Sequence, residues 1–565
     1  MVRLLSHSPP KQLILRAVAS VAMALPALAF AQPDGFIEHR IKQGDTLERL
    51  ATEFYGDVKL WPELQKSNQV ANPKHLQPGS TLRIPVKFLP LQSAEVSFVQ
   101  GQASVTAKPG AEPAELKVGQ KLGEGAEIKV APDSFVTVKL ADGSLIRIQA
   151  QSDVQLQQLR RKGRAGSLQS VLEMQKGSVN ATVGTEPDPT RKFEVRTPRA
   201  TTSVRGTTFD VSLTEGGNAL SSVTHGTVSV QGSDRKNAAQ INQGQGIAVS
   251  SDGQVGQAQE LLPSPDLSKL PDTMEDSNFL SFQIEPVQQA SAYQVQVARD
   301  ESMTEVLRSG TFQSAQVRMK LVDDGNYYVV ARAVDGQQLP GMPAKRALKV
   351  KTQPPPPLYQ QPAPGGTTSR TSGALQCTPV SGVQTYRIQV AANPEGFAQP
   401  LLDQKNSGDC SALLASLPVG SYLWRAASIR QLADGSPDQG PFSKPQAFKL
   451  ADNPATPDLS AMNSAEDIPG LHLQWPGEPD QTYRLQVSRT EDFAQILSDE
   501  KLDKSKWSAT DVKPGTYYVR IKTLDTATGL ESPFSAARQV RAAAEVQSAF
   551  GVPLTSSDGE PLTRK

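Results

Sequence analysis

One five-residue strand pattern occurs three times in the second half of this chain. The pattern, Tyr-x-[Val/Ile/Leu]-Gln-Val, is found at residues 293–297, 386–390 and 483–487. Each copy is followed by a Gly-x-Tyr motif, whose glycines are spaced 95 residues apart at Gly325, Gly420 and Gly515. A repeat of this length, made of short alternating strands, predicts tandem β-sandwiches of immunoglobulin-like size. The chain is therefore expected to be mainly β and multidomain.

These three β-sandwiches are expected at residues 268–352, 371–451 and 468–542. The pattern is similar to fibronectin type III repeats, which implies a role as spacers or protein-binding surfaces. A proline-rich linker is expected at 353–370, and a polar spacer follows the second sandwich. Residues 543–565 lose the strand pattern and are expected to form a disordered tail.

Composition excludes several classes of protein. Lys and Arg total 58 and Asp and Glu total 57, so the formal charge is +1 and no global field favours nucleic acid or an anionic membrane. Two cysteines in 565 residues cannot build a disulfide scaffold or a four-cysteine zinc site. The 42 glycines and 43 prolines suit short strands joined by turns better than a helical enzyme.

Residues 1–31 have the arrangement of a secretory signal peptide. Three basic residues precede an uncharged, mostly apolar run, 17–31, which ends in Ala-Phe-Ala. We expect cleavage before Gln32, which places the mature chain in the periplasm or cell envelope without a membrane span. The alternative is a retained anchor, but the run is shorter than the ~20 residues of a spanning helix.

Residues 37–86 change to a helical period. The spacing i, i+3, i+4, i+7 predicts an amphipathic helix with a buried face of Leu47, Leu50, Ala51 and Phe54. Asp45 is expected to cap this helix, with Glu48 reaching back, and Gly56 to end it. A second short helix around residues 60–64 and brief strands at 39–42 and 82–84 complete a strand–helix–helix–strand unit. Trp61 is interpreted as core packing, with a sugar-stacking platform as the alternative.

This unit resembles the LysM family in HRIKQGDTLERLA, in Asn68 and in LQPGSTLRIP. The resemblance implies a small βααβ fold that binds N-acetylglucosamine-containing glycans, which in a bacterium means peptidoglycan. His39 stands where the family usually has an aromatic residue. The family's ligand contacts lie on two loops, and they carry over to Gly44, Asp45, Thr46, Leu47, Leu76, Gln77, Pro78 and Gly79.

Residues 91–255 follow a period of two. Apolar residues alternate along 136–140 and again along 146–148, with an Asp142-Gly143 turn between them, which predicts a hairpin. The segment resembles the FecR domain, best at KFEVRTPRATTSVRGTTFDVSL. That resemblance implies a β-rich solenoid or roll in the periplasm. Signalling members of the family carry a cytoplasmic helical domain and a membrane span ahead of this part. Neither is recognised here, so we expect an interaction module for an unknown envelope protein.

The densest basic cluster lies inside this segment and consists of Arg160, Arg161, Lys162 and Arg164. Because glycines flank it, we interpret it as a solvated hairpin tip. The alternative is a site for an acidic partner or a phosphate group.

The two cysteines, Cys377 and Cys410, both lie in the middle sandwich. Aligned on the strand pattern and the later glycine, the first repeat has Ile284 and Val317 at their positions, and the third has two tryptophans. Paired apolar residues at both positions suggest that the two sites face each other inside the sandwich, one from each sheet. We expect a disulfide worth about 3–4 kcal/mol in the chain-entropy model, with two separate buried thiols as the alternative.

No motif of a hydrolase, nucleotide-binding loop or metal site is present, and the histidines are scattered over three domains. We therefore expect no catalytic residues, no metal and no cofactor. The leading hypothesis is a non-enzymatic envelope protein that binds peptidoglycan and presents its other domains to protein partners, without nucleic acid. The alternatives are a periplasmic sensor or regulator in a FecR-type signalling pathway and, third, a glycosidase.

Overall fold

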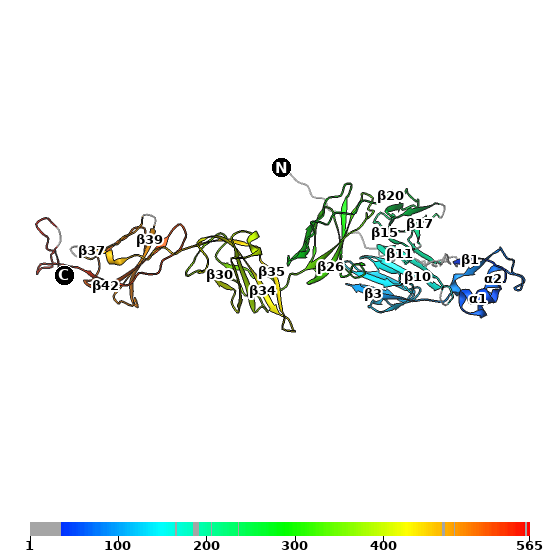
Figure 1. The fold of residues 1–565 in the computed structure, drawn as a ribbon, viewed down its shortest axis with the longest axis horizontal. Helices are drawn as coiled ribbons and strands as arrows, with labels where there is room; N and C mark the ends of the chain where they lie inside the picture. The colour runs from blue at the N-terminus through cyan, green and yellow to red at the C-terminus, as the bar shows by residue number, and fades with distance from the viewer. Residues whose placement is uncertain are drawn as a thin grey trace, which may run out of the picture. The chain divides into compact units, whose positions relative to one another are not determined.

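The computed structural model describes residues 35–163, 166–184, 191–204, 206–234, 237–465, 469–478, 481–559 and 562–564. The signal peptide expected at residues 1–31 lies outside the described residues. The chain divides into two compact units, one of residues 1–132 and 136–258 and the other of residues 133–135 and 259–565. The fold is mainly β, as predicted, with 49% of residues in strands and 6% in helices (Figure 1). Within the described ranges, no helix is both long and apolar enough to cross a membrane.

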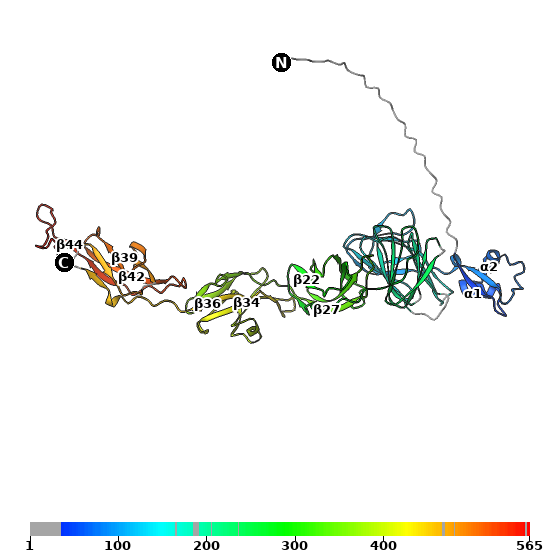
Figure 2. The same cartoon turned by 90° about the horizontal axis from the view of Figure 1, so that it is seen from above.

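The N-terminal module has the predicted strand–helix–helix–strand order. Its elements are β1 Phe36–Arg40, α1 Leu47–Tyr55, a 3-10 turn η1 Val58–Leu60, α2 Trp61–Asn68 and β2 Thr81–Pro85. β1 and β2 pair antiparallel, and the two helices pack together (Figure 2). Their apolar faces form one core around Leu47, Leu50 and Phe54, which are at most 1% exposed, and Trp61 packs half-buried against it.

The start of α1 differs from the prediction, because Thr46 and not Asp45 is the N-cap. The Thr46 hydroxyl accepts a hydrogen bond from the Arg49 backbone N–H at 3.1 Å. The Asp45 carboxylate accepts instead from the Lys42 N–H at 2.8 Å, so it closes the preceding turn. The end of the helix is as predicted, since Gly56 adopts φ +72° and its N–H bonds the carbonyl of Thr52.

Two nine-stranded sheets follow, and residues from both contribute to one hydrophobic core. The first sheet consists of β4 Ala103–Thr106, β5 Ala114–Glu115, β7 Glu127–Val130, β10 Asp153–Arg161, β11 Leu168–Lys176, β13 Lys192–Arg196, β14 Ala200–Val204, β17 Thr227–Gly232 and β18 Ala238–Asn242. The second consists of β3 Ala94–Gln100, β6 Lys121–Leu122, β8 Phe135–Lys139, β9 Leu145–Ile148, β12 Ser178–Thr182, β15 Thr208–Leu213, β16 Ala219–His225, β19 Gln245–Val249 and β20 Gln259–Glu260. The predicted hairpin is present, because Gly143 at φ +81° turns β8 back onto β9.

Three sandwich repeats make up the described part of the second half, each with a larger and a smaller sheet. The first repeat contains β21 Thr273–Met274, β22 Phe279–Gln283, β23 Ala292–Ala298, β24 Val306–Phe312, β25 Gln316–Lys320, β26 Gly325–Val334 and β27 Ala344–Val350. The second contains β28 Tyr359–Gln361, β29 Thr367–Ser369, β30 Ala374–Cys377, β31 Thr385–Ala391, β32 Leu402–Ser407, β33 Ser411–Leu413, β34 Gly420–Gln431, β35 Pro437–Phe442 and β36 Gln446–Ala451. The third contains β37 Asn463–Ala465, β38 Leu471–Gln474, β39 Gln481–Ser488, β40 Ile496–Leu502, β41 Lys506–Ala509, β42 Gly515–Asp525 and β43 Arg538–Ala542.

The two repeated motifs lie on paired strands of the larger sheet, β23 with β26, β31 with β34 and β39 with β42. The tyrosine of each Gly-x-Tyr motif is buried, and its hydroxyl donates to a carbonyl four residues earlier. These bonds are Tyr327 to Asp323 at 2.8 Å, Tyr422 to Pro418 at 2.8 Å and Tyr517 to Lys513 at 2.6 Å. The same corner is therefore built three times, which accounts for the recurrence of the motif.

The boundaries of the second sandwich need correction. β28 and β29 lie within the expected linker 353–370 and pair with β30 and β36. Proline-rich composition concealed them, because their attachment depends on distant partners: the Tyr359 hydroxyl donates to the Lys444 carbonyl at 2.6 Å. The C-terminal segment also differs from the expected disordered tail, since β44 Ala544–Glu545 pairs with β45 Thr563–Arg564.

Cys377 and Cys410 are joined by a disulfide, with their Cα atoms 5.2 Å apart. They lie on one sheet, however, and not on opposite sheets as expected: the Cys377 N–H donates to the Cys410 carbonyl, next to the β30–β33 ladder. The first repeat shows the same arrangement, because the Ile284 N–H donates to the Ala315 carbonyl at 2.8 Å next to the β22–β25 ladder. Alternate residues on neighbouring strands face the core together, so paired apolar residues do not require two sheets.

Candidate functional site

Backbone hydrogen bonds bring the two loops of the N-terminal module together. The first loop connects β1 to α1, and the second precedes β2. The Ile41 N–H donates to the Ser80 carbonyl at 2.9 Å, and the Gly79 N–H donates to the Ile41 carbonyl at 2.8 Å. Gly44 and Gly79 adopt φ +85° and +90°, a region that suits glycine. The two loops that carry the residues expected to contact glycan are therefore held side by side by main-chain hydrogen bonds.

The eight expected contact residues differ in exposure. The exposed ones are Gly44, Thr46, Gln77, Pro78 and Gly79. Leu76 and Asp45 are half-buried. The Leu47 side chain is fully buried in the module core, so only its backbone could touch a ligand. The helical spacing, which predicts Leu47 as a core residue, was therefore a better guide to this position than the family resemblance.

The Asp45 side chain stabilises the first loop through hydrogen bonds. Its carboxylate accepts from Nε2 of His39 at 2.8 Å as well as from the Lys42 N–H, and its side chain is only 4% exposed. Burial raises the pKa of this carboxyl, but the hydrogen bonds from His39 and Lys42 outweigh it, so the net pKa lies below the ordinary value. His39 also packs edge-on against Phe54, with ring centroids 5.5 Å apart, so the imidazole keeps the ring contact of an aromatic residue at this position.

A contact between α2 and β2 supports the second loop. The Asn68 side-chain amide donates to the Arg83 carbonyl at 2.7 Å, and its oxygen accepts from the Arg83 N–H at 2.7 Å, which ties α2 to β2. With its carboxylate occupied, the loop surface offers backbone donors and acceptors, the two side-chain amides of Gln43 and Gln77, and apolar edges. Such groups suit a neutral ligand with hydroxyl and N-acetyl groups better than a charged one.

The basic cluster is a docking contact, and the interpretation as a solvated hairpin tip is wrong. Lys162 forms an ion pair with Glu53 at 3.2 Å, and its Nζ lies 4.4 Å from the Phe54 ring centroid. The Gly163 N–H donates to the Phe54 carbonyl at 2.6 Å. Arg164 lies outside the described residues. The tip of the β10–β11 hairpin therefore sits on the C-terminal end of α1, a long-range contact for which the sequence holds no local signal.

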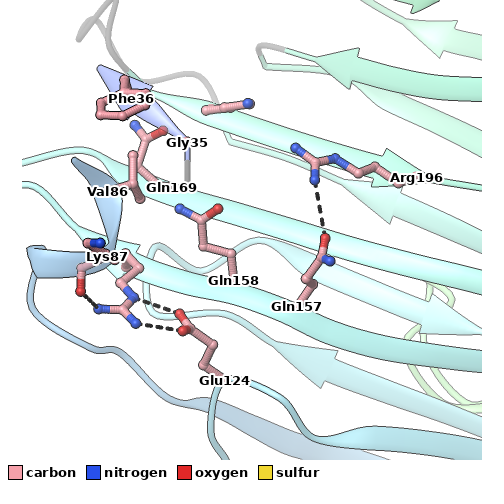
Figure 3. Close-up of a pocket in the computed structure, with 11 residues that line it drawn as sticks. Gly35, Phe36, Val86, Lys87, Glu124, Gln157, Gln158, Gln169 and Arg196 are labelled. Carbon is pink, nitrogen blue, oxygen red and sulfur yellow. Dashed lines mark hydrogen bonds and ion pairs between the residues drawn. The ribbon is translucent and has the colours of Figure 1, made fainter. Parts of the chain in front are cut away.

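Arg160 also strengthens this seam, next to Glu124 and Lys87, which Figure 3 labels. Its guanidinium donates twice to the Glu124 carboxylate, at 2.7 and 2.6 Å, and also to the carbonyls of Lys87 and Leu89. Bidentate pairing of this kind fixes orientation as well as contributing energy. Arg160, oriented by Glu124, thus holds the chain that follows β2 against the two-sheet domain.

Among the residues that the structure describes, no group of three or more His, Cys, Asp or Glu side chains could hold a metal ion. Comparison with protein families gives two matches: the LysM domain at residues 39–85 and the FecR protein family at residues 126–229.

A curated relative, an uncharacterized protein of Deinococcus radiodurans, is 38% identical over 47 residues, 8% of this chain and 19% of the relative. The chain thus spans about a fifth of that relative's length. A crystal structure of a candidate anti-sigma factor from Parabacteroides distasonis is 24% identical over 24% of this chain and 59% of its own, with a TM-score of 0.20. The FN1–FN3 domains of chicken CNTN1 are 13% identical over 49% of this chain and 97% of theirs, with a TM-score of 0.24. The chain therefore carries a LysM domain at 39–85 and, docked on it through the β10–β11 hairpin, a FecR domain at 126–229.

Proposed function

We propose that this chain is a non-enzymatic cell-envelope protein that binds peptidoglycan through its LysM domain and presents its FecR domain and sandwiches to protein partners. The observation that carries the proposal is the paired loop surface of residues 41–47 and 75–80. LysM is a carbohydrate-binding family, and the residues that match its ligand contacts lie on this surface.

The surface supports a glycan ligand in a second respect. Its one carboxylate, Asp45, is occupied by His39 and the Lys42 N–H, while Gln77 and Pro78 are exposed at the tip of the second loop. A planar amide and a flat apolar ring beside backbone donors are suitable groups for an N-acetylated sugar. A single copy implies modest affinity, so tight retention on the wall would need additional contacts.

Co-sedimentation of the whole chain with purified sacculi tests this function. The Q77A/P78A variant removes exposed loop side chains without touching the core, and we expect on the order of fivefold weaker binding to sacculi and to chitin oligomers, the effect of one lost hydrogen bond. K59A/K66A, which alters exposed residues of η1 and α2, is the matched control. Undiminished binding by Q77A/P78A would place the glycan elsewhere.

The FecR match favours a second candidate, a periplasmic sensor or regulator that relays a signal to a membrane partner. Localisation in the periplasm and cleavage before Gln32 belong to either proposal. N-terminal sequencing of the exported protein tests cleavage. A sigma factor or sensor kinase encoded beside this chain would favour the regulatory function.

A further inference from the structure

A cavity lies at the seam between the LysM domain and the FecR domain, with a volume of about 190 Å³. On the LysM side it is lined by the start of β1 and the residues after β2. On the FecR side it is lined by polar residues of β10, β11 and β13 (Figure 3). The loop surface described above lies at the opposite ends of β1 and β2. Five residues of strand separate the two places, or about 15 Å.

The walls of this cavity are rigid before any ligand arrives. Arg160 is held by Glu124 at one side, and at the other Arg196 donates to Gln157 at 3.3 Å. Gln169 of β11 pairs with Arg160 on one side and with Lys192 on the other, and it is only 2% exposed. Figure 3 shows Gln158 between these two ends. Side chains fixed in this way bind without losing much conformational freedom.

The charge of the cavity is positive. Among the described residues that line it, four are cations, Lys87, Arg160, Lys192 and Arg196, and one, Glu124, is a carboxylate. Lys192 and Arg196 share Glu194, at 2.9 and 2.7 Å. Counting that carboxylate, the described side chains around the cavity still carry more positive than negative charge.

Glu194 itself remains ionised. It is 7% exposed, and burial raises the pKa of its carboxyl, but hydrogen bonds and charge from Lys192 and Arg196 outweigh burial and hold the net pKa below the ordinary value. Glu194 therefore holds Lys192 and Arg196 in place. Both cations have further N–H donors that can bind an anion.

An aromatic ring completes the rim. Phe36 is 44% exposed, an unusual state for a phenylalanine, and it lines the same cavity. An exposed ring, planar amides and an excess of cations together match a ligand with an apolar ring face, hydroxyl or amide groups and a carboxylate. Those are the features of a sugar that carries an acid.

We propose that this cavity is a second saccharide subsite, one that takes the carboxylate-bearing, peptide-substituted sugar of peptidoglycan. The inference rests on the proposed peptidoglycan function, because it assigns the other sugar of the same polymer to a second site. Two subsites on one rigid pair of domains raise the retention of a glycan strand without requiring either to be strong.

The test uses the whole chain and two soluble probes: a disaccharide–tetrapeptide fragment of peptidoglycan and a neutral chitin tetramer. In F36A/K192Q, Phe36 is exposed and Lys192 is half-buried, and Arg196 still pairs with Glu194. We expect affinity for the acidic fragment to fall on the order of tenfold, the loss of one charge-assisted hydrogen bond, and chitin affinity to stay unchanged. F279A/K59Q is the matched control, since Phe279 is an exposed ring, 37% accessible, in the first sandwich.

Unchanged affinity of F36A/K192Q for the acidic fragment would overturn the inference, and chitin binding by that variant would then show the loop function intact. The wild-type chain could also fail to bind chitin and yet bind the acidic fragment in a manner that depends on Phe36 and Lys192. That result would refute glycan binding by the loops and support the second subsite.

Discussion

The loop surface and the seam lie at opposite ends of the β1–β2 pair, and they are built from different parts of the chain. The loops are joined by backbone hydrogen bonds, such as that from the Gly79 N–H to the Ile41 carbonyl. The seam depends on charged side chains, with Arg160, oriented by Glu124, on the Lys87 and Leu89 carbonyls and Lys162 on Glu53. Loops joined by main-chain hydrogen bonds keep their conformation when exposed side chains are replaced, whereas a contact made by charged side chains depends on each partner and on salt. Substitutions should therefore separate glycan binding from domain docking.

The largest loss of stability is expected from removing the Cys377–Cys410 disulfide. Removing the bridge in C377S/C410S should destabilise the middle sandwich by about 3–4 kcal/mol, because a loop of 33 residues is no longer closed in the unfolded chain. Denaturant unfolding measures the loss. Thiol labelling of the denatured, unreduced wild-type protein is the companion experiment, and two reactive thiols per chain would refute the bridge.

Two glycines with positive φ provide the sharpest non-covalent contrast. A Cβ on Gly163 would lie 2.3 Å from the Glu53 carbonyl oxygen, whereas a Cβ on Gly44 would meet nothing within 4 Å. G163A should cost about 2–4 kcal/mol and release the hairpin from α1, since steric overlap adds to backbone strain. G44A should cost only about 1 kcal/mol of strain. Hydrogen exchange at the end of α1 measures docking, and equal protection in G163A and G44A would remove the contrast.

The Arg160–Glu124 pair comes next. Both side chains are at least three-quarters buried, with 15% and 22% of their areas exposed, so R160M should cost about 1–3 kcal/mol. Thermal unfolding at low and high salt measures it. The wild-type chain should lose part of this stability in salt and R160M should not, while a salt dependence shared by both would show that the seam charges do not matter.

The sequence predicted repeating elements well and long-range contacts poorly. The period of two located β8 and β9, and the i, i+3, i+4 spacing located α1, because a one-sided core imposes those periods locally. The docking of Lys162 on Glu53 leaves no such trace, since the partners are more than 100 residues apart. Thr46 and Asp45 are both good capping residues, and only the turn back to Lys42 decides between them.

A smaller effect is expected at that cap. T46A should cost about 1 kcal/mol, because the Arg49 N–H loses its acceptor, and T46S should restore most of it. Denaturant unfolding of the whole chain measures both variants. Equal destabilisation by T46S and T46A would contradict the capping role.

The smallest expected effect is the loss of the stability contributed by Asp45 at acid pH. The lowered pKa of Asp45 means that its ionised form is favoured by folding, so its contribution is present above the unfolded carboxyl pKa near 4 and is lost as pH falls through the still lower folded value. D45N should therefore be less stable than wild type at pH 7 and approach it near pH 3. Thermal unfolding at both pH values measures the difference, and a constant gap would rule out this linkage.

The central claim, that the paired loops bind glycan, is tested most directly by hydrogen exchange of the whole chain with and without a chitin oligomer. Ligand should slow exchange at backbone amides of residues 41–47 and 75–80, and leave the sandwiches unchanged. Protection that is absent from both loops, or confined to other domains, would contradict the account.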